Sequence, residues 1–446
     1  MSFTVSSYGE ALDYLYKRLP MFSRVGSAAF RADLDNIRAL CAALDHPEQH
    51  FKSIHIAGTN GKGSVSHMLA AVCQTAGYRT GLYTSPHLKD FRERIRIDGT
   101  MIPREAVVDF VNRLLPMMEA LQPSFFEITV AMAFAHFARE RVDVAIIETG
   151  LGGRLDSTNI ILPELSVITN ISLDHQDILG HTLPEIAGEK AGIIKPGIPV
   201  VIGETQPETA PVFRETARRL GSPLRFADQE WQLHRQALQQ GEPRYYFRGK
   251  DGADHILEPD LGGAYQSKNL CTLLAACTLL EERGWGLTLP VIQQGIKQVR
   301  AVTGLRGRWE IAGYRPLTVF DVAHNEGGIR EIVAQLSHTS YRQLHVVMGF
   351  VKDKTVGHIL TLLPRNAVYY FCRAALPRAM DEKVLQAQAA AAGLQGEAWP
   401  GVQEAFRAAQ RRAGPEDMIL VCGSFFVVGE VLPEEGSAGR LQPAQP

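Results

Sequence analysis

The sequence predicts an α/β protein with two domains, each built around a mostly parallel sheet. Short apolar runs alternate with segments of helical periodicity, and a glycine-rich loop follows the first clear strand. The alternation starts again near residue 301. Because 446 residues are too many for one ordinary core, we expect one domain over residues 1–300 and a second over residues 301–432.

The first domain is expected to begin with two helices and then to alternate strands with helices. Apolar residues at helical spacing predict the opening helices near residues 12–19 and 37–44. A further helix is expected over residues 65–72, with Gly77 at its C-cap, and another over Phe125–Arg139. Apolar runs predict sheet strands at Lys52–Ala57, Thr80–Tyr83, Asp143–Glu148, Leu165–Thr169 and Pro199–Ile202.

The rest of the chain is expected to close this domain and form the second. Residues 224–258 are richer in polar residues and alternate weakly, which predicts a small antiparallel excursion. Helices at Gln266–Arg283 and Pro290–Val299 follow it. The second domain is expected to be smaller and Rossmann-like, and residues 433–446 are expected to form a disordered tail. The predicted strands of the second domain are Pro316–Asp321, Leu344–Gly349, Ala367–Phe371 and Met418–Cys422.

Composition excludes several classes of protein. The 46 basic and 48 acidic residues give a net charge of −2, which does not suggest a nucleic-acid-binding surface. No apolar run is long enough to span a membrane, and the first residues lack the features of a secretion signal. We therefore expect a cytoplasmic protein that binds neither nucleic acid nor a membrane. We also expect a monomer. The cysteines form no C-x-x-C pair and are expected to be buried free thiols: Cys41, Cys73, Cys271, Cys277, Cys372 and Cys422.

The strongest local signal is Ile54–Ser64, an apolar strand that leads into a glycine-rich loop with a lysine. Such a loop presents backbone N–H groups to phosphate oxygens, and Lys62 adds a positive charge. The loop departs from the common pattern G-x-x-x-x-G-K-[ST]. Ile56 stands where the first glycine belongs, and Gly63 separates Lys62 from the hydroxyl of Ser64. The loop predicts a nucleotide-phosphate site with its own spacing.

Glu148 is the second strong signal, because it ends an apolar strand and precedes another glycine-rich segment. The carboxyl ends of parallel strands line the crevice in which α/β sheets bind ligands. Beside a phosphate loop, a carboxylate there would hold Mg²⁺ directly or through water. The alternative is a solvated acid at a strand end. The loop upstream favours the metal role.

Other residues allow both a structural and a functional interpretation. His175 follows a strand and is either a satisfied structural histidine or a metal ligand. Lys190 is either a helix-surface lysine or a buried amine that reacts with CO₂. Ser85 belongs either to a Ser-Pro turn or to a cation site. Phe125 and Phe126 either flank a flat heterocycle or belong to the core.

Motifs in one order extend along nearly the whole chain. They lie at residues 58–64, 84–88 with 93–94, 148–159, 174–175, 189–195, 266–269, 305–310 and 320–325. Together they resemble the folylpolyglutamate synthase and dihydrofolate synthase family, the folate branch of the Mur-type ligases. Gly63, which breaks the generic pattern, is part of this family's own loop.

The resemblance implies an ATP-dependent ligase that adds L-glutamate to a folate-type carboxylate through an acyl phosphate. It implies tetrahydrofolate polyglutamylation, and we expect the joining of L-glutamate to dihydropteroate as well. ATP would be held by Thr59, Asn60, Gly61, Lys62, Gly63, Ser64, Asn269, Arg308 and Asp321. Two Mg²⁺ sites would use Ser85, Glu148 and His175, and the folate-type substrate would contact Ser124, Phe125, Phe126, Glu127, Leu155, Asp156 and Ser157. The catalytic residues would be Glu148, His175 and Lys190, with Lys190 carbamylated so that it supports the second metal site.

Three other interpretations fit less well. A peptidoglycan-type Mur ligase acting on a UDP-linked precursor usually carries a separate domain before the phosphate loop, and only about fifty residues precede it here. A nucleotide-switch GTPase needs an N-K-x-D motif, which the chain lacks. A dinucleotide-binding dehydrogenase needs G-x-G-x-x-G, which residues 150–154 do not provide.

Overall fold

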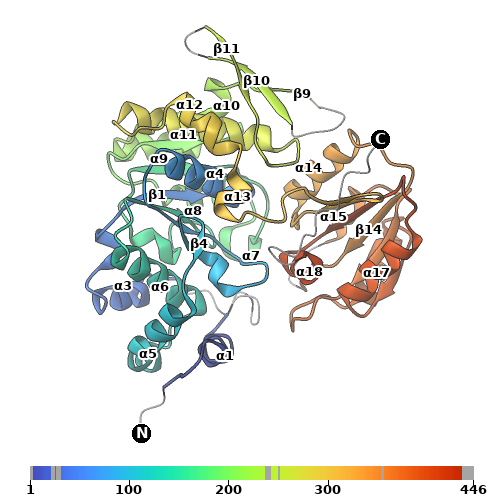
Figure 1. Cartoon of the computed structure of the whole chain (residues 1–446), viewed down its shortest axis with the longest axis horizontal. Helices are drawn as coiled ribbons and strands as arrows, with labels where there is room; N and C mark the ends of the chain where they lie inside the picture. The colour runs from blue at the N-terminus through green and yellow to red at the C-terminus, as the bar shows by residue number, and fades with distance from the viewer. Residues whose placement is uncertain are drawn as a thin grey trace. The chain divides into compact units, whose positions relative to one another are not determined.

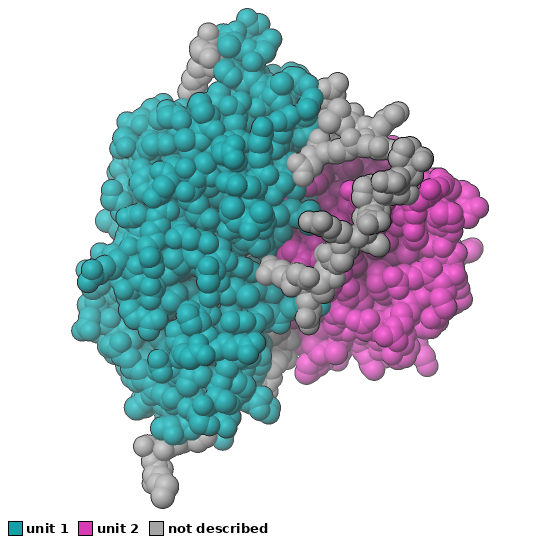
Figure 2. All heavy atoms as spheres, in the orientation of Figure 1, with its two compact units in different colours: residues 1–260, 265–305 teal, residues 261–264, 306–446 magenta. Residues whose placement is uncertain are grey.

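The computed structural model describes residues 4–21, 26, 32–236, 243–249, 252–352 and 356–433. The chain divides into two compact units (Figure 2): residues 1–260 with 265–305, and residues 261–264 with 306–446. The division thus follows Leu305, just after helix α13 (Val299–Thr303).

The first unit contains an eight-stranded sheet in the order β4-β3-β2-β5-β1-β6-β7-β8. Figure 1 labels β1 and β4 of this sheet. The six neighbouring strands β2, β5, β1, β6, β7 and β8 are parallel. The hairpin β3–β4 pairs with β2 and adds an antiparallel edge. The central strand β1 pairs with β5 on one side and β6 on the other. The bounds are β1 Lys52–Ala57, β2 Thr80–Tyr83, β3 Ile95–Ile97, β4 Thr100–Met101, β5 Val144–Glu148, β6 Leu165–Ile168, β7 Val200–Ile202 and β8 Leu224–Phe226.

Helices pack along this sheet. Side chains alternate between the faces of a strand, and every residue from Val144 to Ile147 is buried, so both faces of β5 are covered. Helix α4 packs against β1, β2 and β5 and against α11 and α12, whereas Ala145 and Ile147 share a core with α1, α3, α5 and α6. The principal helices are α1 Tyr8–Arg18, α3 Asp35–Ala42, α4 Lys62–Thr75, α5 Arg104–Leu121, α6 Phe125–Arg139, α7 Gln176–Leu179, α8 Leu183–Ala191, α9 Ala210–Leu220, α10 Ala227–Glu230, α11 Gln266–Glu282 and α12 Leu289–Ile296.

The second unit contains a six-stranded sheet in the order β12-β13-β17-β14-β15-β16, parallel except for β12. Its strands are β12 Glu310–Tyr314, β13 Leu317–Phe320, β14 Leu344–Met348, β15 Val368–Cys372, β16 Gly396–Trp399 and β17 Met418–Cys422. Its helices are α14 Glu326–Leu336, α15 Gly357–Thr361, α16 Glu382–Ala391, α17 Val402–Arg412 and α18 Phe425–Val431. The predicted α/β class, with a larger phosphate-loop sheet and a smaller parallel one, is confirmed.

Several predicted elements differ in detail. The excursion predicted at residues 224–258 is partly wrong, because β8 joins the main parallel sheet. Only β9 (His234–Gln236), β10 (Arg244–Arg248) and β11 (Asp254–Leu257) form a separate antiparallel sheet, which stands out in Figure 1. The helix predicted to end at Val299 stops at Ile296, and α13 follows as a separate helix. Apart from Pro433, the predicted tail at residues 433–446 lies outside the described residues.

All six cysteines are buried free thiols, as predicted. In the described part of the chain, no helix combines the length and apolar character needed to cross a bilayer.

Candidate active site

The glycine-rich loop joins β1 to α4 and leaves backbone donors at the helix start. Gly61 is the N-cap of α4 and has a φ of +84°, in the left-handed region that favours glycine. A Cβ at this position would lie 2.4 Å from Oδ1 of Asn269, so the Asn269 side chain of α11 approaches the loop closely here. The N–H groups of the first helical turn, residues 62–64, have no helical acceptor and carry the positive end of the dipole. This is the geometry of an anion site.

A second loop, after β6, holds the glycine-rich loop in place. The backbone N–H of Thr59 donates to the carbonyl of Asn170 at 2.9 Å, and that of Asn60 donates to Asn170 Oδ1 at 2.9 Å. Asn60 Nδ2 donates to Ser172 Oγ at 3.1 Å, and Ser172 N donates to Thr59 Oγ1 at 3.1 Å. Asn170 and Ser172 were not predicted from the sequence as parts of the site. The position of Asn170 directly after the strand that neighbours β1 was the available signal.

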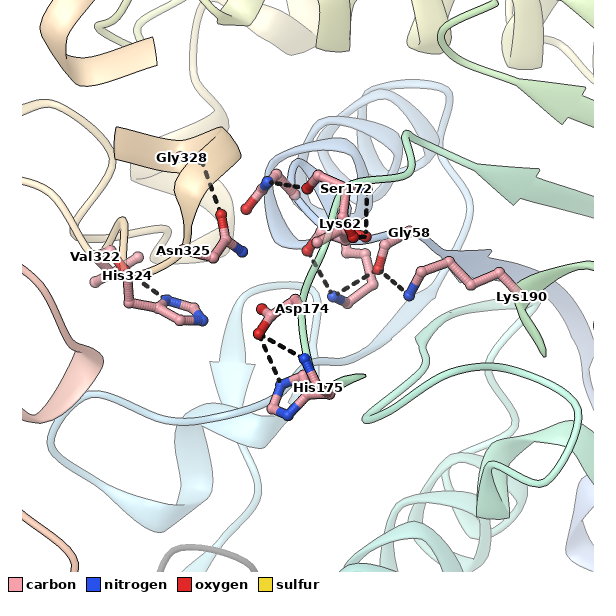
Figure 3. A network of polar contacts seen from close by, with 12 residues as sticks. Gly58, Lys62, Ser172, Asp174, His175, Lys190, Val322, His324, Asn325 and Gly328 are labelled. Atoms are coloured by element: carbon pink, nitrogen blue, oxygen red, sulfur yellow. Dashed lines mark hydrogen bonds and ion pairs between the residues drawn. The ribbon is translucent and has the colours of Figure 1, made fainter. Parts of the chain in front are cut away.

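Two lysines meet at one carbonyl of this loop (Figure 3). Lys62 Nζ donates to Gly58 O at 3.0 Å and to Thr59 O at 3.2 Å. Lys190 Nζ, from α8, donates to the same Gly58 O at 2.9 Å. Lys190 is only 4% exposed, so the alternative of a helix-surface lysine is wrong.

Burial lowers the pKa of Lys190 to about 7, and the positive charge of Lys62 contributes in the same direction. Asp174 and Asp156 oppose the shift. A substantial fraction of Lys190 is therefore a neutral amine near neutral pH, which is the nucleophilic form.

Glu148 and Ser85 come together at the carboxyl ends of adjacent strands. Glu148 ends β5 and is 4% exposed, so it is not a solvated strand-end acid. Its Oε2 accepts the backbone N–H of Ser85 at 3.3 Å, two residues after the end of β2. A carboxylate and a hydroxyl at this edge are the hard oxygen donors that Mg²⁺ prefers.

His175 lies on the loop after β6, at the start of α7. Its backbone is left-handed, with a φ of +50°, and its N–H donates to Asp174 Oδ1 at 2.9 Å. The same carboxylate oxygen lies 3.9 Å from His175 Nε2 (Figure 3). Among the described residues, no three side chains of His, Cys, Asp or Glu are close enough to hold a metal by themselves. Asp174 contacts His175, and its negative charge opposes the lowering of the Lys190 pKa. It was missed as a site residue although its motif was recognised.

The two aromatic residues at the start of α6, Phe125 and Phe126, lie in different environments. Ser124 and Glu127 form a capping box, in which each side chain accepts the other's backbone N–H, at 3.2 and 2.6 Å. Phe125 is 3% exposed and packs with Phe91 and Tyr16 in the core. The half-buried ring of Phe126 lies against Gly150, two residues after Glu148.

Asp156 organises the loop that follows Glu148. Its carboxylate, 3% exposed, accepts the N–H of Leu151 at 2.8 Å and both the N–H and the hydroxyl of Thr158, at 3.0 and 2.5 Å. The hydroxyl of Thr158 in turn contacts Nε2 of the buried His55 at 2.8 Å. Leu155 and Ser157, on either side, are half-buried. The side chain of Asp156 therefore shapes this loop, while its neighbours remain partly accessible.

In the second unit, Arg308 and Asp321 lie near one another. Asp321 follows β13, and its carboxylate accepts the N–H of Trp309 at 2.9 Å and of Ala323 at 2.9 Å. The Arg308 guanidinium lies 5.2 Å from the ring centre of Phe425. Figure 3 also shows two contacts in the following segment: His324 Nδ1 is 3.0 Å from Val322 O, and Asn325 caps α14 through Gly328 N.

Comparison with known proteins finds two matching family models. The Mur ligase middle domain matches residues 56–277, and the Mur ligase glutamate ligase domain matches residues 307–425. The chain is 34% identical over 438 residues to the dihydrofolate synthase/folylpolyglutamate synthase of Bacillus subtilis, which covers 96% of this chain and 98% of that protein.

Two solved structures have the same fold over almost the whole chain. Escherichia coli FolC in complex with DHPP and ADP has a TM-score of 0.83 and 29% identity, covering 97% of this chain and 98% of that one. A bifunctional folylpolyglutamate synthase/dihydrofolate synthase with Mn, AMPPNP and L-glutamate bound has a TM-score of 0.80 and 29% identity, with the same coverage.

Proposed function

Because the chain belongs to the dihydrofolate synthase and folylpolyglutamate synthase family of Mur-type ligases, we propose that it uses ATP to join L-glutamate to folate-type carboxylates. The observation that carries this proposal is the glycine-rich loop with Lys62, set beside Glu148 and the buried Lys190. A carboxylate and an amine do not condense at neutral pH, so the site must activate the acceptor. The peptidoglycan-type alternative is set aside, since the match to folate ligases covers both units.

The reaction has two steps. The acceptor carboxylate oxygen attacks the γ-phosphorus of ATP, which gives an acyl phosphate and releases ADP. The amino group of L-glutamate then attacks the acyl carbon, the C–O bond to phosphate breaks, and inorganic phosphate and a proton leave. Both steps bring anions together, so catalysis consists mainly of charge stabilisation and positioning.

The phosphates of ATP would bind the N–H groups of residues 61–64, with Lys62 supplying positive charge. The carbonyl contacts of Lys62 hold its ammonium at this loop. Asn269 supports the proposal because it lies against Gly61. Arg308 and Asp321 are proposed as further nucleotide contacts.

Ser85 and Glu148 fit one divalent cation, because Mg²⁺ takes one or two protein oxygens and completes its shell with phosphate and water. His175 is proposed for a second cation, with Asp174 fixing the loop that carries it. When bound, these ions supply neutralisation of the transferring phosphoryl group.

Lys190 is proposed to be carbamylated. Its neutral amine would attack CO₂ and lose one proton, which forms an N–C bond and replaces a cation with a carboxylate. The new anion would sit among Lys62 and the proposed cation ligands and would relieve the repulsion between two ammonium groups on Gly58 O.

The folate-type acceptor would contact the segments at residues 124–127 and 155–157. The half-buried Phe126 is the aromatic surface available to a flat ring, whereas Ser124, Glu127 and Asp156 position their backbones through internal hydrogen bonds. We propose activity with both dihydropteroate and reduced folates, because the Bacillus subtilis relative carries both names.

The test is to supply ATP, Mg²⁺ and L-glutamate with either dihydropteroate or tetrahydrofolate, and to measure ADP release and product mass. The proposal predicts ADP and a product extended by one glutamyl residue with each acceptor. Extension of tetrahydrofolate alone would remove the dihydrofolate synthase activity. No extension of either acceptor would contradict the proposed function.

A further inference from the structure

We propose that Glu204 is a positioning residue for the nucleotide site, acting through the amide of Asn170 on the glycine-rich loop. The inference rests on the proposed binding of ATP phosphates at this loop. Glu204 lies two residues after β7, and its two carboxylate oxygens contact Asn170 and Lys268.

The contacts of Asn170 fix the orientation of its side-chain amide. The Asn60 backbone N–H is only a donor, so the Asn170 atom facing it at 2.9 Å must be the oxygen. This leaves the NH₂ group on the other side, where it donates to Glu204 Oε1 at 3.0 Å. An ionised carboxylate only accepts hydrogen bonds, so Glu204 permits one amide orientation and rejects the flipped one.

Glu204 is itself fixed. Its second oxygen, Oε2, pairs with Lys268 Nζ at 3.0 Å, in the first turn of α11. Gly203 allows the chain before Glu204 to pass close to β6, because a Cβ at Gly203 would lie 2.2 Å from the carbonyl oxygen of Thr169. The carboxylate therefore links the ends of β6 and β7 to α11.

The consequence concerns which N–H groups of the loop are free for phosphate. Asn170 occupies two of them, through its backbone carbonyl to Thr59 and its side-chain oxygen to Asn60. A flipped amide would set two donors against each other at Asn60 and release that side of the loop. The Glu204–Asn170 pair thus fixes the loop shape that presents residues 61–64 to the nucleotide.

The test exchanges the two functional groups. In Asn170→Asp, two carboxylates face each other across the 3.0 Å contact, and we expect KM for ATP to rise about tenfold while kcat changes little. In the double variant N170D with E204Q, the new carboxylate at position 170 accepts from the Asn60 N–H. The new amide at position 204 donates its NH₂ to that carboxylate, and its oxygen accepts from Lys268. Every hydrogen bond is restored, so KM should return to near the wild-type value.

The matched control is Glu282→Gln, which removes an equivalent ion pair between α11 and Arg225, 2.6 Å long and away from the loop. It should leave KM for ATP unchanged. Melting temperature is measured for each variant, and ADP affinity is measured by calorimetry as a readout independent of turnover. If N170D does not fold, Glu204→Ala provides the test and should weaken ADP binding in a folded protein.

The inference is supported if KM for ATP and ADP affinity are impaired in N170D and return to near wild-type values in the double variant. Equal defects in both, or wild-type values in N170D and E204A, would overturn it. Wild-type protein that is inactive with ATP and both acceptors would instead contradict the proposed function, so the two failures are distinguishable.

Discussion

Glu148 and Asp321, at the carboxyl ends of the two parallel sheets, differ in how many backbone N–H groups their carboxylates accept, one for Glu148 and two for Asp321. In the first unit, the loop after β1 begins a helix with free N–H groups, and the buried Glu148 and Lys190 lie at the same edge. In the second unit, the carboxylate of Asp321 accepts two backbone N–H groups of its own unit. We propose that the buried charges of Glu148 and Lys190 serve the reaction, whereas the carboxylate of Asp321 also maintains a loop of its own unit.

The same contrast separates kinetic from structural effects. A buried charge held for a ligand should affect kcat when it is removed and should affect folding little. A carboxylate occupied by backbone donors should affect stability first, because its loss leaves buried N–H groups without an acceptor.

Glu148→Gln gives the largest expected effect. The amide keeps the shape of the side chain but loses the charge proposed to hold Mg²⁺, so kcat should fall about a thousandfold with little change in melting temperature. Initial rates of ADP release measure it. Glu140→Gln, which removes an exposed ion pair with Arg79, is the control and should be close to wild type. A kcat for E148Q within about threefold of the wild-type value would contradict the proposal that the charge of Glu148 serves the reaction.

Lys190 should make activity depend on CO₂ and pH. With a pKa of about 7, its amine is mostly protonated and unreactive toward CO₂ at about pH 6 and mostly neutral at about pH 8. After acid treatment under nitrogen, the enzyme should be nearly inactive at the higher pH until bicarbonate is added. The rate of recovery should rise with pH through about 7.

The control for this experiment is Lys190→Arg. Arginine keeps the positive charge and stays protonated, so it cannot react with CO₂, and the variant should be inactive with or without bicarbonate. Full activity of the wild type in CO₂-free buffer, together with a crystal map showing a bare ammonium, would contradict the carbamate.

Asp321→Asn sharpens the second half of the comparison. An asparagine oxygen can accept from either Trp309 or Ala323, but its NH₂ then faces the other backbone N–H. We expect a loss of about 1–3 kcal/mol in the free energy of unfolding, with the larger kinetic change in KM for ATP. Urea unfolding measures the first. A variant with wild-type stability but a large loss in kcat would instead indicate that Asp321, like Glu148, serves the reaction.

The aromatic pair repeats the contrast within one helix turn. Phe125→Ala should cost about 3–5 kcal/mol of stability, because the ring is buried in the core. Phe126→Ala should fold normally and raise KM for the folate-type acceptor up to about tenfold. Steady-state kinetics with varied acceptor distinguishes the two. Equal stability losses would assign both rings to the core.

Sequence patterns predicted the regular elements well where one signal dominated. The bounds of β1, α6 and β17 agree with the structure because each is a continuous apolar or helical pattern with clear ends. Strand β8 was misassigned because three residues at a sheet edge carry no periodicity, and only its pairing with β7 identifies it.

The site was predictable in its motifs but not in its contacts. The glycine-rich loop and Glu148 could be identified because each follows an apolar strand. The burial of Lys190 depends on how α8 packs under the loop, which no local pattern contains. The contacts of Asn170 and Glu204 depend on β1, β6 and β7 lying side by side, although β2, β3, β4 and β5 separate β1 from β6 along the chain.

The most direct test of the account follows the oxygen of the acceptor carboxylate. With dihydropteroate or tetrahydrofolate labelled with ¹⁸O in that carboxylate, phosphoryl transfer to the oxygen and its departure with phosphate should place one ¹⁸O atom in each inorganic phosphate. Mass spectrometry of the phosphate measures this transfer. Label appearing in phosphate in proportion to the amide formed is the predicted result. Amide formation with unlabelled phosphate would contradict activation of the carboxylate by ATP.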